Sequence, residues 1–206
     1  MNVELPVPPE PSELAREMKI RLLSDPNAGP TEWEAAFHEA GHVVAEAKIA
    51  GSLPDTVRFG SPENEFAGRT ESRSFLDVRG MLPRLAELDE AQGAFVRQRA
   101  SAKGAWTVGG DLATYLAMEL ENVLGDLHGL AIWIAGDGGY VGSDHEEMIR
   151  LATAMAPDDI EGWIEERLQE ALGCLRSNWT SVTLVAQLLV AHRVVIRDDL
   201  EWLLES

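Results

Sequence analysis

The sequence predicts a mainly α-helical domain with one small antiparallel β hairpin. Most of the 206 residues lie in segments whose apolar side chains recur every three or four positions, which predicts amphipathic helices. Two short stretches, 56–60 and 66–73, flank the polar linker 61–65, a pattern that predicts a hairpin. No repeat or low-complexity tract divides the chain. We therefore expect an arm over residues 1–12 and a single domain over residues 13–206.

The first two helices are delimited by clear breaking signals. A helical pattern over residues 13–24 ends at the Asp-Pro-Asn-Ala-Gly-Pro segment 25–30. Thr31-x-x-Glu34 then has the spacing of a capping box, in which each side chain satisfies a free backbone N–H at the start of a helix. We expect this second helix to cover about residues 32–50 and to end at Gly51, a usual helix-terminating residue.

The remainder of the chain after the hairpin is predicted to be helical. We expect a helix over residues 82–102, a loop framed by Gly104 and the Gly109-Gly110 pair, and a long helix over residues 111–135. Further helices are expected over residues 143–155, 157–175, 178–192 and 198–204.

Composition excludes several classes of protein. The net charge of −18 and the pI of about 4.5 argue against nucleic acid and anionic membrane surfaces as partners. The single cysteine, Cys174, allows no internal disulfide and excludes a cysteine-rich zinc module. No apolar run has the length of a membrane span, and the N-terminus lacks the pattern of a secretory signal. The expected location is the cytoplasm.

The segment Ala36–Ala45 concentrates the chemistry, because it contains His-Glu-x-x-His inside a predicted helix. Residues four apart share a helix face, so His38 and His42 can bind one zinc ion at about 2.0–2.1 Å from each ring nitrogen. Glu39 is then the expected general base that activates water. Small apolar flanks indicate burial, which disfavours an accidental match. Gly41 costs about 1 kcal/mol relative to alanine, which indicates a close approach to the backbone.

This pattern predicts a zinc hydrolase, in the first place a peptidase, on a zincin-like helical domain with the hairpin beside the helix. A catalytic zinc ion usually takes three protein ligands, so a third is required. Asp144 is the best candidate, because it follows the glycine-rich turn 138–143 and stands in the first turn of a helix. In the competing interpretation, Ser143-x-x-Glu146 is only a capping box with acidic residues at a helix start. Glu46, one helical turn beyond the motif, is the rival ligand. The weaker candidates are His128, His145 and Glu147.

The segment Phe37-His38-Glu39-Ala40-Gly41-His42 resembles the zinc helix of the peptidase domain of the FtsH family, the ATP-dependent membrane-bound zinc proteases. Further segments between residues 31 and 205 are similar in order. The pair of strands within 57–70 follows the zinc helix, and residues 127–131 stand where the family has its Gly-Arg-x-Ala-Glu-Glu helix. Val141-Gly142-Ser143-Asp144 resembles the loop that carries the family's third zinc ligand. The resemblance thus implies Asp144 as the third ligand.

The chain departs from that family in three respects. It lacks a phosphate-binding loop and a membrane segment, the family's paired acids are replaced around Trp133, and extra residues, mainly 74–110, precede Asp144. We therefore expect a stand-alone, ATP-independent zinc metallopeptidase that acts on flexible peptides, exposed loops or one dedicated partner. Two alternatives are a metal-binding regulatory module with reduced catalysis and a repressor-cleaving peptidase of the ImmA/IrrE type, which shares His-Glu-x-x-His.

Overall fold

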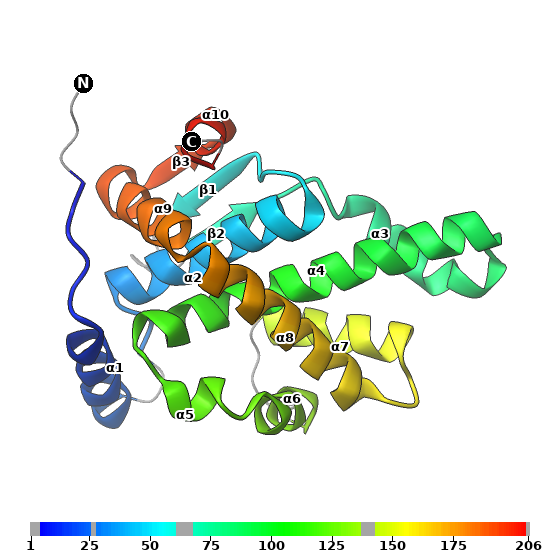
Figure 1. Ribbon diagram of the computed structural model, residues 1–206, viewed down its shortest axis with the longest axis horizontal. Coiled ribbons are helices and arrows are strands. Elements are labelled where there is room, and N and C mark those ends of the chain that lie inside the picture. Colours follow the sequence, from blue (N-terminus) through cyan, green and yellow to red (C-terminus); the bar gives the residue numbers. More distant parts are fainter. Residues whose placement is uncertain (1–4, 26–27, 61–67, 137–142, 205–206) are drawn as a thin grey trace.

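The computed structural model describes residues 5–25, 28–60, 68–136 and 143–204 (Figure 1). Within them the protein is mainly helical, which confirms the predicted mainly α class, and the hairpin is part of a small antiparallel sheet of three strands. None of the helices in these ranges combines the length and the apolar character that crossing a bilayer requires.

The elements occur in the following order along the chain. They are α1 (Pro11–Ser24), α2 (Glu32–Ala45), the π-helical turn η1 (Glu46–Ala50), β1 (Thr56–Phe59), β2 (Gly68–Glu71), α3 (Leu76–Met81), the 3₁₀ turn η2 (Leu82–Glu87), α4 (Glu90–Ala117), α5 (Glu121–Leu124), α6 (Leu127–Gly136), α7 (Ser143–Met155), α8 (Ile160–Ser177), α9 (Trp179–His192), β3 (Val194–Ile196) and α10 (Arg197–Leu204). The segment before α1 packs on α9, where Gln187 Nε2 donates a hydrogen bond to the carbonyl oxygen of Pro6 at 2.8 Å.

The sheet has the strand order β2-β1-β3, and both pairings are antiparallel. Val57, which is fully buried, lies opposite Thr70 on one side and Val195 on the other. The β1–β2 pairing confirms the two predicted strands, while the predicted linker 61–65 lies outside the described residues. The sequence did not reveal β3, because three residues between two helices are too short to show an alternating pattern.

The predicted loop at Gly104 and Gly109-Gly110 is wrong, because α4 runs without interruption through all three glycines. Each glycine marks a close approach by a neighbour. A Cβ atom on Gly104 would lie 2.6 Å from the ring of Trp163, and one on Gly109 would lie 3.0 Å from the carbonyl oxygen of Gly41. The glycines therefore serve packing between helices rather than chain reversal.

The long helix predicted over residues 111–135 is also wrong. The chain leaves the helical path after α4, where Glu119 adopts a positive φ of 51°. The short helix α5 and the separate helix α6 follow. The apolar spacing across residues 112–134 continues through this break, so periodicity alone merged three elements into one.

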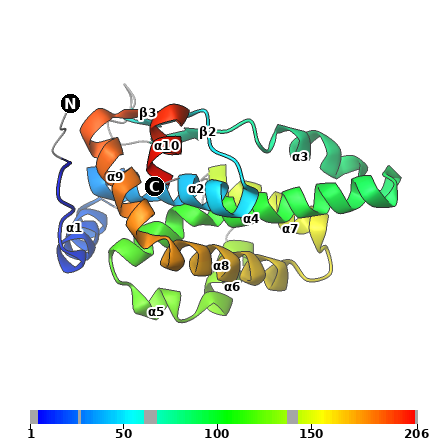
Figure 2. The ribbon, with the colours of Figure 1, turned by 45° about the horizontal axis from the view of Figure 1, so that its top comes forward.

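Helix α2 lies at the centre of the fold (Figures 1 and 2). It packs against α4 and α9, and α8 packs in turn against α4. On the α9 side, the ring of Phe37 stacks on that of Trp179 with centroids 5.7 Å apart. Eleven of the fourteen residues of α2 are buried. Because the helix is fixed on several sides, its polar side chains have defined positions.

Candidate metal centre

The start of α2 is fixed by the predicted capping box. Glu34 Oε2 accepts a hydrogen bond from the backbone N–H of Thr31 at 2.5 Å, and Thr31 Oγ1 accepts one from the N–H of Glu34 at 3.3 Å. Arg21 of α1 also donates to the Glu34 carboxylate, with its Nη2 2.9 Å from both oxygens. These contacts set the first turn of α2, one turn before His38.

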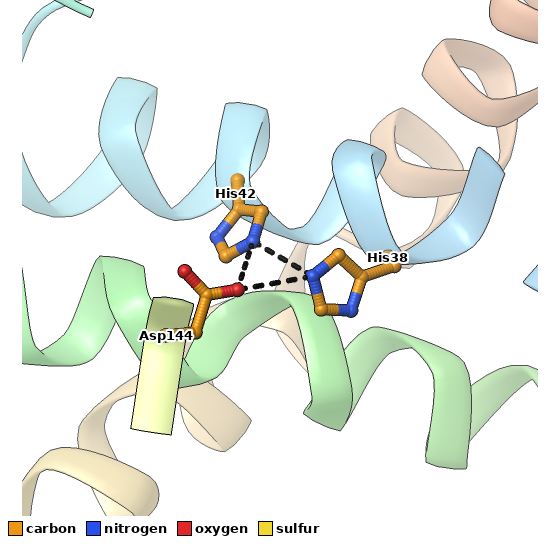
Figure 3. Close-up of side chains that lie close together, drawn as sticks. All are labelled: His38, His42 and Asp144. Carbon is orange, nitrogen blue, oxygen red and sulfur yellow. Dashed lines mark hydrogen bonds and ion pairs between the residues drawn. The ribbon is translucent and has the colours of Figure 1, made fainter. Parts of the chain in front are cut away.

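Three ligand atoms converge beside α2 (Figure 3). His38 Nε2 and His42 Nε2 lie 3.0 Å apart, and Asp144 Oδ2 lies 3.2 Å from the first and 3.3 Å from the second. In a tetrahedral zinc site with bonds of about 2.0–2.1 Å, neighbouring ligand atoms are about 3.3–3.4 Å apart. The observed triangle is close to that size, so the three residues could hold one metal ion.

Both imidazoles present Nε2 to this triangle because their Nδ1 atoms are engaged elsewhere. His42 Nδ1 lies 2.8 Å from the backbone carbonyl oxygen of Trp106, and His38 Nδ1 lies 3.4 Å from Asp111 Oδ1. A proton on each Nδ1 leaves the Nε2 lone pairs facing one another and the carboxylate oxygen. Three electron-rich atoms at this separation repel each other unless a cation lies between them. The donor set therefore fits a divalent metal ion.

Glycines allow α4 to form the floor of the centre. A Cβ atom on Gly110 would lie 2.7 Å from the Nε2 atoms of His38 and His42. At the place where α2 crosses α4, a Cβ atom on Gly41 would collide with the carbonyl oxygen of Gly109. This close approach, which the sequence predicted at Gly41, brings the backbone of α4 against the motif.

The centre is open on one side. The side chains of His38 and Asp144 are 28% and 27% exposed, whereas that of His42 is 4% exposed. The ring of Trp106 covers His42, with the ring centroids 4.7 Å apart. A metal ion held by these three residues would thus be closed off near His42 and accessible near the other two ligands.

The contacts within the centre shift the pKa values of its members in opposite directions. Burial lowers the pKa of His38, but Asp111 and Asp144 outweigh it, so the net pKa lies well above its ordinary value. Burial likewise lowers the pKa of His42, and Asp144 reverses the effect. Burial raises the pKa of Asp144, yet the two imidazoles hold it far below the usual range. The centre attracts positive charge, whether protons or a metal ion.

Glu39 lies beside this triangle in a confined position. Its side chain is buried, and Oε2 accepts a hydrogen bond of 2.5 Å from Thr70 Oγ1 of strand β2. A Cβ atom on Gly68 of the same strand would collide with the Glu39 carboxylate. The negative charge of Glu39 also raises the pKa of both imidazoles, which indicates its proximity to them.

The other candidate ligands lie outside the triangle. Glu46 is fully buried, and its Oε1 accepts hydrogen bonds from Ser72 and Ser74 at 2.6 and 2.7 Å. His128 pairs with Glu165 at 2.9 Å on the surface. The remaining two are engaged as well: His145 Nε2 lies 3.0 Å from Asp111 Oδ2, and Glu147 forms ion pairs with Lys103 and Arg150.

The ion pair between Glu147 and Lys103 anchors α7, which carries Asp144, to α4, whereas the pair with Arg150 lies within α7. Burial raises the pKa of Glu147, but Arg150 and Lys103 lower it to about 2. Most of the glycine-rich turn 138–143, including the side chain of Ser143, lies outside the described residues, and the capping box expected at Ser143 and Glu146 stays a prediction.

Sequence reasoning missed three groups that touch the centre: Asp111, Thr70 and the carbonyl oxygen of Trp106. The signal available for Asp111 was its position directly after the Gly109-Gly110 pair, which was interpreted as a loop. Thr70 was placed in a strand, but no spacing rule links it to Glu39. A backbone carbonyl oxygen carries no sequence signal at all.

Comparisons with known protein families, curated proteins and solved structures found no match for this chain. The resemblance to the FtsH peptidase domain therefore rests on the residues quoted above.

Proposed function

We propose that the protein is a zinc-dependent metalloendopeptidase of zincin-like, FtsH-like design that hydrolyses peptide bonds in flexible polypeptides without ATP, in the cytoplasm. One observation supports this proposal above all. A triangle of two imidazole nitrogens and one carboxylate oxygen lies next to the buried carboxylate of Glu39, and one face of the triangle is exposed. Two histidines and one carboxylate are a common ligand set of catalytic zinc.

The residues of the chain have separate roles in this reaction. His38, His42 and Asp144 hold the ion, which when bound supplies Lewis acidity toward a water molecule and the scissile carbonyl group. Glu39 accepts a proton from the attacking water and delivers it to the leaving amine. Thr70 holds one oxygen of Glu39 through a hydrogen bond, and Gly68 lies close to the same carboxylate, so strand β2 positions the base.

Strand β2 offers a way to align the substrate. In the described part of the chain, β2 pairs only with β1 and forms an edge of the sheet. An extended peptide can add to such an edge through backbone hydrogen bonds. Gly68 and Thr70 of β2 touch Glu39, so a peptide added there would run past the general base. This mode needs an unfolded segment, which agrees with flexible polypeptides as substrates.

The main alternative is a regulatory module that binds metal without turnover. The carboxylate of Glu39 argues against it, because a structural site needs no buried acid that is held by a threonine beside the ligands. A purely structural zinc site also usually has four protein ligands, whereas three converge in the described part of the chain.

Digestion of a broad peptide library tests the proposal. The zinc-loaded protein should cleave library peptides, and a chelator should abolish cleavage. Glu39→Gln should retain zinc and lose about 10²–10⁴-fold in rate, the usual contribution of a general base. Glu146→Gln, an exposed acid on α7, is the matched control and should cleave like the parent. Equal cleavage by Glu39→Gln and the parent would refute the role of Glu39.

A further inference from the structure

We propose that Asp111 is a positioning residue that ties the metal ligand His38 to the helix carrying the ligand Asp144, and thereby sets the affinity for the divalent cation. The inference deepens the proposed function, since it rests on the same metal centre. It concerns a residue that the motif does not contain and that lies on a third helix, α4.

Both oxygens of Asp111 are engaged, each by a different part of the centre. Oδ1 lies 3.4 Å from His38 Nδ1, and Oδ2 lies 3.0 Å from His145 Nε2. His145 directly follows Asp144 on α7. One carboxylate on α4 thus contacts an imidazole of α2 and the residue adjacent to the carboxylate ligand. Asp111 lies in the interior of α4, where it cannot act as a helix cap.

The two histidine ligands differ in how they are held. His42 is buried, is covered by the ring of Trp106 and faces a backbone carbonyl oxygen through Nδ1. His38 is 28% exposed and faces the Asp111 side chain through Nδ1. Packing and a backbone contact therefore orient His42 without a side-chain partner at Nδ1, whereas Nδ1 of His38 faces the side chain of Asp111. A carboxylate at Nδ1 also fixes the tautomer and increases the basicity of the coordinating nitrogen.

The contact with His145 adds a constraint on α7. The ring of His145 has only 13% of its side chain exposed and lies edge-on to Trp133 of α6, with centroids 5.1 Å apart. Its position is thus defined by α6 on one side and by Asp111 on the other. Because Asp144 is the preceding residue, rotation of α7 that moves the third ligand would also break the Asp111–His145 contact.

Competition with a chromogenic chelator measures the zinc affinity that this inference concerns. Asp111→Ala should bind zinc about 10–100-fold more weakly than the parent, the usual effect of removing such a partner. Asp111→Asn keeps one acceptor oxygen and should be affected less than Asp111→Ala. His145→Phe, which removes the second contact, should also weaken binding. Glu146→Gln removes a neighbouring negative charge without touching the centre and should bind within about two-fold of the parent.

Substitution of cobalt(II) for zinc gives a second measurement, which the loss of the negative charge of Asp111 alone would not change. The visible absorption of the cobalt-loaded protein reports ligand geometry, and we expect Asp111→Ala to alter it while Glu146→Gln leaves it unchanged. Circular dichroism of the metal-free variants checks the fold. If Asp111→Ala fails to fold, Asp111→Asn replaces it in both measurements. We then expect weaker zinc binding and an altered cobalt spectrum for Asp111→Asn.

The outcomes separate this inference from the proposed activity. Zinc affinities of both Asp111 variants within about two-fold of the parent would overturn the inference. If the Asp111 variants bind zinc more weakly than the parent and His145→Phe does not, the inferred link between Asp111 and α7 is overturned. A parent that binds zinc and cleaves no peptide refutes the peptidase and leaves the positioning role intact. A parent that binds no zinc overturns both.

Discussion

Replacing Gly41 by alanine tests whether the metal centre depends on the close crossing of α2 and α4. The added methyl group would collide with the carbonyl oxygen of Gly109 and lie 2.7 Å from Cβ of Ala113. Carbon atoms in contact are normally about 3.5–4.0 Å apart, so the two helices must separate by roughly 1 Å. Neither obstacle is the flexible end of a side chain, so the strain cannot be relieved locally.

A second glycine isolates the packing cost. Gly173 is exposed in the middle of α8, and a Cβ atom there would have no neighbour within 4 Å. Alanine in a helix is favoured over glycine by about 1 kcal/mol, so Gly173→Ala should stabilise the protein by about that amount. Gly41→Ala should gain the same stabilisation from helix propensity and lose about 1–3 kcal/mol to overpacking. The difference in unfolding free energy between the two variants therefore measures the packing cost alone.

Urea denaturation of the metal-free proteins is the appropriate assay, since bound zinc would add its own stabilisation. We expect Gly41→Ala to be about 1–3 kcal/mol less stable than Gly173→Ala. Its zinc affinity should also fall by about ten-fold or more, because the orienting contact of His42 with Trp106 crosses the same helix interface. Equal stability of the two variants, together with unchanged zinc affinity, would refute the reasoning.

Two further predictions concern the groups around the centre. Thr70→Val removes the hydrogen bond to Glu39 while conserving shape, and should lower kcat by roughly ten-fold with little change in KM. A Thr70→Val variant with the kcat of the parent would contradict this role. The metal-free protein should lose stability as the pH rises above about 6.5, since folding raises the pKa of both His38 and His42 and the folded state therefore binds their protons more tightly. Zinc-saturated protein should lack this loss, and urea denaturation across a pH series would show whether the two forms differ.

The elements best predicted from the sequence were those with local signals. The capping box of Thr31 and Glu34, the helix over residues 32–50 and its end at Gly51 follow from neighbouring residues alone, and the structure has all of them. The structure also brings His38, His42 and Asp144 together in a group that could hold a metal ion, and their role as zinc ligands stays a prediction. For Asp144, the residues alone left Glu46 as a rival, and the resemblance to a family favoured Asp144.

The errors arose where tertiary packing overrides a local preference. Gly104, Gly109 and Gly110 are usual loop residues, yet here they lie inside α4 because a tryptophan ring, another helix backbone and two imidazoles approach them. The same error concealed the role of Asp111, because the direction of a side chain that follows a loop cannot be predicted from the sequence. Once α4 is continuous, Gly110 and Asp111 both fall on the side of the helix that meets His38.

The fold and the metal centre depend on different interactions. Large apolar side chains from α2, α4, α8 and α9 form the core, so burial of apolar surface is available without a cation. The centre instead gathers three carboxylates, Glu39, Asp111 and Asp144, around two imidazoles, which concentrates negative charge at one open face. The same carboxylates raise the pKa of both imidazoles, which favours their protonated forms when no metal is bound. Metal binding should therefore release protons rather than drive folding, so zinc affinity should increase with pH while the helical content stays constant.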